Sequence, residues 1–298
     1  MAESKVELRK LRDFGENFND TFSFIRQNGK PLVKAFFSIC GIFLLIHAIF
    51  NGIYQSRNFG FLDRIRNIGA NPVTTDTDVP SVFSIEYFML LIFGMLAYTA
   101  ILTMTGSYIK HYDENNGEQA NVDQVWQIFK RYYLRIFLYM IPVNILVFVS
   151  IFFCCFPVFY FFTVLAPFPI VVILEDLSFG DAFSRCFIII KNNFWISLAI
   201  YLVAGMIYYA SSTLVGFIVG LVVGLASYFT TKDIGTTVGL VTSILNIFSS
   251  LFLLILIISI ALNYFNLVEQ FDGTGIMRRI DNLGNTENNN FDNIEEQY

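Results

Sequence analysis

The sequence predicts an all-α, polytopic membrane protein with six transmembrane helices in three hairpins, each hairpin preceded by a cytoplasmic amphipathic interfacial helix. Three observations predict this fold: an apolar composition, long apolar stretches and an uneven distribution of positive charge. Of the 298 residues, 55% are hydrophobic and only 14% are charged, whereas soluble proteins carry roughly 25% charged residues. So few charges cannot cover a water-facing surface, but lipid solvates apolar side chains directly.

The apolar stretches give the expected spans, because a transmembrane helix needs about 20 largely apolar residues. The expected spans are residues 31–53, 85–109, 136–153, 156–174, 194–213 and 238–263. The stretch 194–229 is too long for one crossing at about 1.5 Å per residue. We therefore expect a break near Ser211, after which residues 214–229 re-enter the membrane or, as an alternative, form a seventh span.

The positive charges set the expected orientation, because cytoplasmic loops carry the excess of lysine and arginine. Six spans with the N-terminus inside place only Arg57, Arg64, Arg66 and Lys232 outside, out of 19 lysines and arginines. We therefore expect a multi-pass protein of the bacterial cytoplasmic membrane with both termini in the cytoplasm. A seventh span would move Arg278 and Arg279 outside, which fits the rule less well.

The acidic net charge of −5 lies mostly in the C-terminal tail. Residues 270–298 hold six acids and two bases and are rich in asparagine. This composition is too polar to form a core, so the tail is predicted to be largely disordered. No basic domain is present, and nucleic acid is therefore not an expected partner.

An internal repeat is the most specific pattern in the sequence. Phe14–Asn28 and Phe179–Asn193 align without gaps, with these identities: Phe14/Phe179, Gly15/Gly180, Phe18/Phe183, Phe22/Phe187, Ile25/Ile190 and Asn28/Asn193. Steps of four, four and three residues place the aromatic side chains on one face of a helix. We expect Phe18 and Phe183 to be buried, and each copy to end in a turn before a spanning helix.

A third, weaker copy is residues 121–135, in which Val125, Phe129 and Tyr132 take the positions of the aromatic stripe. The three expected interfacial helices are then residues 14–28, 121–135 and 178–193. Basic and aromatic residues on them could bind lipid headgroups at the cytoplasmic interface. The candidate lipid-contacting residues are Phe14, Phe18, Phe22, Arg26, Lys30, Arg131, Arg135, Phe183, Arg185, Phe187, Lys191 and Trp195.

The stretch Glu175–Trp195 resembles a signature of bacterial six-span membrane domains related to the membrane domain attached to some glycerophosphoryl diester phosphodiesterases. The matching residues are Glu175, Ala182, Phe183, Arg185 and Trp195, and Cys186 replaces the usual serine. The resemblance covers about 20 residues and implies the six-span architecture. It does not imply the phosphodiesterase activity, because this chain has only two histidines and no room for the soluble catalytic domain.

Few polar residues lie in the expected spans, and none is a central acid or base. His47 and Asn51, four residues apart in the first span, share a helix face and could line an intramembrane polar path. Interhelical hydrogen bonding is the plainer interpretation. Gly216, Gly220 and Gly224 form a small-residue run that is typical of close helix packing, within the chain or in a homodimer.

These patterns predict a non-enzymatic membrane module that interacts with membrane lipids, or with a protein partner, at the cytoplasmic interface. No catalytic motif, metal-ligand cluster or cofactor fingerprint is present in the sequence, so no cofactor is expected. A transporter or flippase-like carrier of an amphiphilic small molecule is the first alternative. A structural membrane subunit without a ligand is the second.

Overall fold

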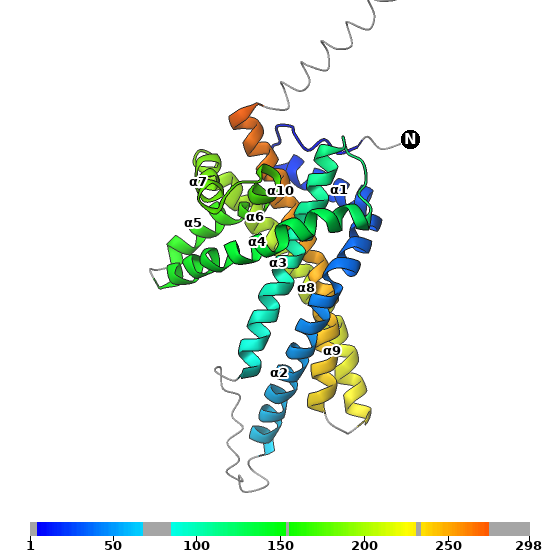
Figure 1. Ribbon diagram of the computed structural model, residues 1–298. Helices are drawn as coiled ribbons and strands as arrows, with labels where there is room; N and C mark the ends of the chain where they lie inside the picture. Colours follow the sequence, from blue (N-terminus) through cyan, green and yellow to red (C-terminus); the bar gives the residue numbers. More distant parts are fainter. Residues whose placement is uncertain (1–4, 68–84, 153–154, 231–233, 274–298) are drawn as a thin grey trace, which may run out of the picture.

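The computed structural model describes residues 5–67, 85–152, 155–230 and 234–273, and the regular structure in these ranges is entirely helical (Figure 1). The helices are α1 (Phe14–Ala35), α2 (Gly41–Asn67), α3 (Ile85–Glu114), α4 (Val122–Ile151), α5 (Cys155–Leu165), α6 (Phe168–Glu175), α7 (Phe179–Ile190), α8 (Phe194–Thr230), α9 (Ile234–Ser249) and α10 (Leu253–Asp272). A π-helical turn, Phe36–Cys40, joins α1 to α2, and a 3₁₀ turn, Ser250–Phe252, joins α9 to α10.

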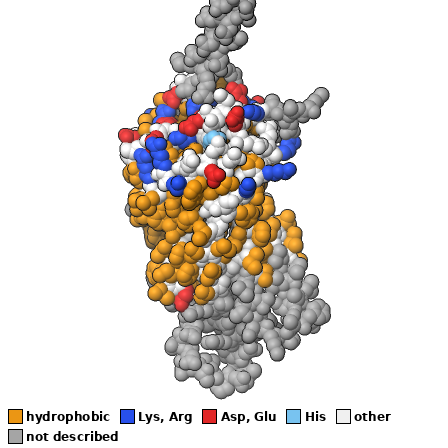
Figure 2. Space-filling view, turned by 45° about the vertical axis from the view of Figure 1, so that its right-hand side comes forward, with side chains coloured by type: hydrophobic (Ala, Val, Ile, Leu, Met, Phe, Trp, Pro, Cys, Tyr) orange, Lys and Arg blue, Asp and Glu red, His pale blue; other side chains and the backbone are white. Residues whose placement is uncertain are grey.

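Six helical segments are long and apolar enough to cross a membrane. Figure 2 shows the charged side chains gathered at one end of the molecule, above a broad apolar surface. Large hydrophobic side chains are exposed along α4, where a lipid environment would solvate them. They are Leu134, Leu138, Ile145, Phe148 and Val149. The fold class expected from the sequence, an all-α multi-pass membrane protein, is confirmed.

The first interfacial helix and the first span are joined without a break in the helical structure, and the turn expected at Asn28 is absent. The helix runs through Pro31, which lies inside α1, and continues into α2 through the π-helical turn. The chain changes direction between α1 and α2 (Figure 1). Proline removes one helical hydrogen bond and can bend a helix without ending it. The wider π-helical turn rotates the residues that follow it relative to those of α1.

The fifth span is also longer than expected, and the break predicted near Ser211 is wrong. α8 is a single helix of 37 residues, about 55 Å long at 1.5 Å per residue. Serine and threonine in an apolar helix can bond to their own main chain, so they do not break it as proline does. Residues 214–229 therefore extend the fifth span, and α9 packs against α8 and α2.

Two other spans are interrupted. α5 ends at Leu165 and α6 begins at Phe168, so the fourth span is two helices joined at Ala166 and Pro167. The last span, expected at 238–263, is built from α9, the 3₁₀ turn and α10. Residues 270–272, expected to begin the tail, end α10, and residues 274–298 lie outside the described part of the chain.

The core lies at the charged end and surrounds the second half of α3. Every residue from Ala100 to Ile109 is buried. A Cβ on Gly106 would collide with the side chain of Ile173 in α6, so α3 and α6 touch closely there. α3 also packs against α2, α4 and α10.

The segment before α1 ties the charged ends of three helices together. The guanidinium of Arg9 donates to Asp113 of α3, with Nη2–Oδ2 at 2.6 Å, and stacks over Phe265 of α10 at 5.5 Å. The main-chain N–H of Arg12 donates to Asn266 of α10 at 2.9 Å. The Arg12 side chain, which has no exposed surface, binds Asp20 of α1 at 2.8 Å and carbonyls of its own segment.

Replacing Arg12 by alanine should destabilise the protein strongly, because the substitution leaves buried carbonyls without a donor and removes a charge partner of Asp20. We expect a loss of about 3 kcal/mol in the free energy of unfolding. Unfolding followed by circular dichroism in detergent micelles measures it. The exposed Lys30→Ala variant is the control and should change stability by less than about 0.5 kcal/mol. Equal losses in the two variants would contradict this role of Arg12.

Candidate functional site

Three helices at the charged end begin with the same kind of cap. Asp13 precedes α1 and accepts from the N–H of Glu16 at 2.7 Å, Asn121 precedes α4 and donates its N–H to Gln124 at 2.7 Å, and Ser178 precedes α7 and accepts from the N–H of Asp181 at 3.4 Å. α1 and α4 begin with a reciprocal capping box, whereas α7 has only the bond that the Ser178 side chain accepts from the N–H of Asp181.

The buried face follows the cap in all three helices. The residues four, eight and eleven positions after each cap are buried: Asn17, Thr21 and Phe24 in α1; Val125, Phe129 and Tyr132 in α4; Ala182, Cys186 and Ile189 in α7. Aligning the helices on their cap residues gives the same pairing of α1 with α7 as the sequence alignment. The same alignment shifts the third copy by one residue, because Val125 of α4 then matches Asn17 of α1 rather than Phe18.

The aromatic stripe expected to be buried lies beside the buried face, not on it. Phe18 and Phe183 are half-buried, and Phe14 and Phe22 are 43% and 47% exposed. In α1 two of these buried positions hold polar residues that have hydrogen-bond partners: the Ser259 hydroxyl of α10 donates to Asn17 at 2.9 Å, and the Thr21 hydroxyl donates to the Asn17 carbonyl at 2.7 Å. Phe14 and Phe22 are left on the outer surface.

Three arginines among the candidate lipid-contacting residues are paired with acids of the same chain. Arg131 and Arg135 of α4 both bind the carboxylate of Asp176, each at 2.7 Å. Asp176 caps the C-terminus of α6 in the left-handed conformation, with φ at +52°. These pairs clamp α4 to the connection between α6 and α7.

The neighbouring acid, Glu175, binds residues of α7 and α10. Glu175 accepts from Arg185 of α7 at 3.2 Å and from the hydroxyl of Tyr264 of α10 at 2.7 Å. Arg185 also binds Asp272, at the end of α10. The adjacent acids Glu175 and Asp176 therefore join α4, α6, α7 and α10. The sequence signal for this role was two carboxylates directly after a span, but their partners lie too far away in sequence to be assigned from it.

Lys10 and Lys110 also pair with acids, Asp20 and Glu114, but four other lysines behave differently. Lys30, Lys34, Lys130 and Lys191 are exposed and form no ion pair with a residue in the described ranges. Exposed apolar residues lie three or four positions from three of them in the sequence: Phe37 follows Lys34, Trp126 and Leu134 flank Lys130, and Trp195 follows Lys191 across a turn. Arg26 is exposed on the same face of α1 as Lys30.

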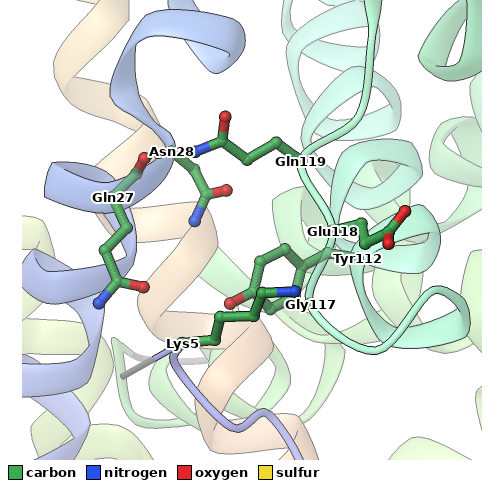
Figure 3. Close-up of a pocket in the computed structure, with 7 residues that line it drawn as sticks. All are labelled: Lys5, Gln27, Asn28, Tyr112, Gly117, Glu118 and Gln119. Carbon is green, nitrogen blue, oxygen red and sulfur yellow. Dashed lines mark hydrogen bonds between the residues drawn. The ribbon is translucent and has the colours of Figure 1, made fainter. Parts of the chain in front are cut away.

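A polar cleft of about 540 Å³ opens where Pro31 interrupts the hydrogen bonds of α1 (Figure 3). Pro31 has no N–H, so the Gln27 carbonyl lacks its helical donor. The side chain of Gln119, from the loop between α3 and α4, donates to that carbonyl at 2.9 Å. The other lining residues are Lys5, Asn28, Tyr112, Gly117 and Glu118.

The intramembrane residues that were singled out do not form one site. The side chain of His47 is half-buried and packs against Gly94 of α3, where an added Cβ would lie 3.2 Å from the His47 ring. Asn51 is buried on the same helix. A Cβ on Gly216 or Gly220 would meet none of the described atoms within 4 Å. Gly224 lies outside the residues whose surroundings are described.

No known protein family, curated protein or solved structure matches this chain. Within the described ranges, no group of three or more histidine, cysteine, aspartate or glutamate side chains could hold a metal ion. Interpretation of the site therefore depends on its own geometry.

The pairs at Asp176 should make stability depend on pH. Partial burial raises the pKa of Asp176, but the hydrogen bond from Arg135 and the charges of Arg131 and Arg135 outweigh burial and hold the pKa below its ordinary value. A lowered native pKa stabilises the fold above the unfolded value, near 3.9, and this stabilisation is lost as pH falls through the native pKa. Asp176→Asn should thus be less stable than wild type at pH 7, and the gap should close as the pH falls below the native pKa of Asp176, as measured by thermal unfolding. A gap that is independent of pH would contradict the prediction.

The hydrogen bond from Gln119 to the Gln27 carbonyl, four residues before Pro31, can be tested by a double-mutant cycle. Gln119→Ala should lower stability by about 0.5–1 kcal/mol, because the Gln27 carbonyl loses its donor. In a Pro31→Ala background, residue 31 gains an N–H that can donate to Gln27. Gln119→Ala should therefore cost clearly less there, as measured by chemical unfolding. The same cost in both backgrounds would show that Gln119 acts in some other way.

Proposed function

We propose that this protein is a non-enzymatic integral membrane module of the bacterial cytoplasmic membrane that holds anionic phospholipids around its charged end. The observation that supports this function is the sorting of the basic residues. Arg131, Arg135 and Arg185 are used in ion pairs between helices or their connections, whereas Lys30, Lys34, Lys130 and Lys191 are exposed and form no ion pair with a described residue.

The position of these lysines suits a phosphate headgroup. A lysine ammonium is a compact charge on a flexible stem, which can reach a phosphate without a fixed geometry. Each basic residue near an anionic membrane surface contributes about 1 kcal/mol. Trp126, over which Lys130 lies, and Trp195 are both exposed, and tryptophan favours the boundary between headgroups and acyl chains. In this proposal the charged end is cytoplasmic, in agreement with the charge asymmetry.

Native mass spectrometry of the protein released from membranes tests the proposal. The wild type should retain anionic phospholipid, and replacement of Lys30, Lys34, Lys130 and Lys191 by alanine should reduce the retained lipid several-fold. The matched control replaces the same four lysines by arginine, which keeps the charge and should keep most of the lipid. Equal retention in the alanine variant and the wild type would overturn the proposal.

A carrier of an amphiphilic small molecule is a second candidate, favoured by the interruption of the fourth span between α5 and α6. Interrupted helices inside the membrane are a recurring element of transporter sites. Movement of a fluorescent phospholipid between the leaflets of proteoliposomes, lost in a His47→Ala variant, would favour the carrier over the static module.

A further inference from the structure

Two lysines near the end of α1 stand one helical turn apart. Lys30 and Lys34 leave the helix on the same face, with roughly 5–6 Å between their Cβ atoms. Both are exposed, and neither forms an ion pair with a described residue. The acids of α1, Glu16 and Asp20, lie in its first two turns. Because like charges at this spacing repel each other and weaken a helix, an anion that touches both lysines would stabilise α1.

The packing of α1 keeps the two lysines on its outer face. Asn28, Leu32 and Ala35, which lie on the opposite side of the helix, are buried. The Asn28 side chain accepts from the hydroxyl of Tyr108 in α3 at 2.9 Å, which ties this turn of α1 to the core. The helix backbone therefore fixes where both lysine side chains begin, and only their flexible stems have to adjust to a ligand.

An exposed apolar surface continues from the lysines toward the membrane. Phe37 follows Lys34 by three residues, where the chain enters the first span, and its ring centroid lies 6.3 Å from that of Phe248 in α9. Phe248 and Ile244 are one turn apart on α9, and all three apolar side chains are exposed. Since α9 extends away from the charged end (Figure 1), Ile244 lies farther from that end than Phe248. A lipid with its phosphates at the lysines would have this surface for its acyl chains.

The other two exposed lysines are solitary. The positions three and four residues away from Lys130 and from Lys191 hold no second lysine or arginine. The two arginines that follow Lys130 most closely, Arg131 and Arg135, both bind Asp176. Lys30 and Lys34 are therefore the pair of lysines whose charges can act on one ligand from a single helix face.

We propose that Lys30 and Lys34 together bind a phospholipid with two phosphates, of the cardiolipin class; this rests on the proposed function and specifies its lipid. Each phosphodiester of such a lipid carries one negative charge, and a glycerol bridge keeps the two phosphates close enough for one to meet each ammonium. Basic surfaces on the cytoplasmic side of membrane helices are suited to this headgroup. The acyl chains lie along Phe37 and Phe248. Lys130 and Lys191 each attract a lipid with a single phosphate.

Native mass spectrometry of the full chain, given equal amounts of cardiolipin, phosphatidylglycerol and phosphatidic acid, tests this inference. The wild type should retain cardiolipin several-fold better than either of the other lipids. Phosphatidic acid is the control for charge, because its single phosphate can carry close to two negative charges. A preference for cardiolipin over phosphatidic acid therefore reports two separated phosphates rather than total charge.

Two double variants that remove the same charge locate the site. Lys30→Gln with Lys34→Gln should abolish the preference for cardiolipin, whereas Lys130→Gln with Lys191→Gln should keep it. Equal loss of the preference in the two variants would overturn the inference, and so would a wild type without the preference. The proposed function would survive either result if the four-lysine alanine variant still loses anionic lipid.

Thermal unfolding of the wild type gives a second measurement that needs no variant. Binding to the native state alone raises the unfolding midpoint, so cardiolipin should raise it more than phosphatidylglycerol does at an equal concentration of phosphate. Equal rises with the two lipids would contradict a site built for two phosphates.

Discussion

The structure depends on one constraint: inside an apolar belt without water, each polar group must find its partner within the protein. The helices satisfy their own main chain, but every proline within a span removes a donor. At Pro31 the missing N–H lies near the charged end, and the side chain of Gln119 donates from a loop to the Gln27 carbonyl in its place. At Pro167 and Pro169 the N–H groups are missing as well, and the fourth span is divided there into α5 and α6. Proline therefore recruits a side-chain donor at one place and interrupts a span at the other.

The constraint also explains how the charged end is assembled. Arginine can bind carboxylates through several N–H groups of fixed geometry, and here it joins helices that are far apart in sequence. Arg9 reaches Asp113, and Arg185 reaches both Glu175 and Asp272. These pairs are partly buried, so removing one partner leaves a charge that solvent compensates poorly. Directional ion pairs and hydrogen bonds thus stabilise the charged end of the bundle, whereas van der Waals packing of apolar side chains stabilises the apolar belt.

Much of the fold could be predicted from the sequence, because hydrophobicity and span length are local properties. The number of candidate spans and their approximate positions follow from them. The continuity of the helices does not: Ser211 looks like a break but can bond to its own helix, whereas Pro167 interrupts a span that looked uniform. The buried face of α1 was also mispredicted, because hydrophobicity favours burial of Phe18, while Asn17 is buried through a bond to Ser259 that only the tertiary structure reveals.

Counting positive charges treats arginine and lysine as equivalent, and this chain shows why the count cannot find a lipid site. Arg131, Arg135 and Lys130 are neighbours on α4, yet both arginines turn to Asp176 while the lysine lies over Trp126 at 5.9 Å. A charge that is already paired has little attraction left for a phosphate, because its field is largely cancelled at the distance of a headgroup. The orientation of the protein in the membrane can depend on all of these residues. In the proposed function, the affinity for individual lipids depends on the few that form no ion pair with a described residue.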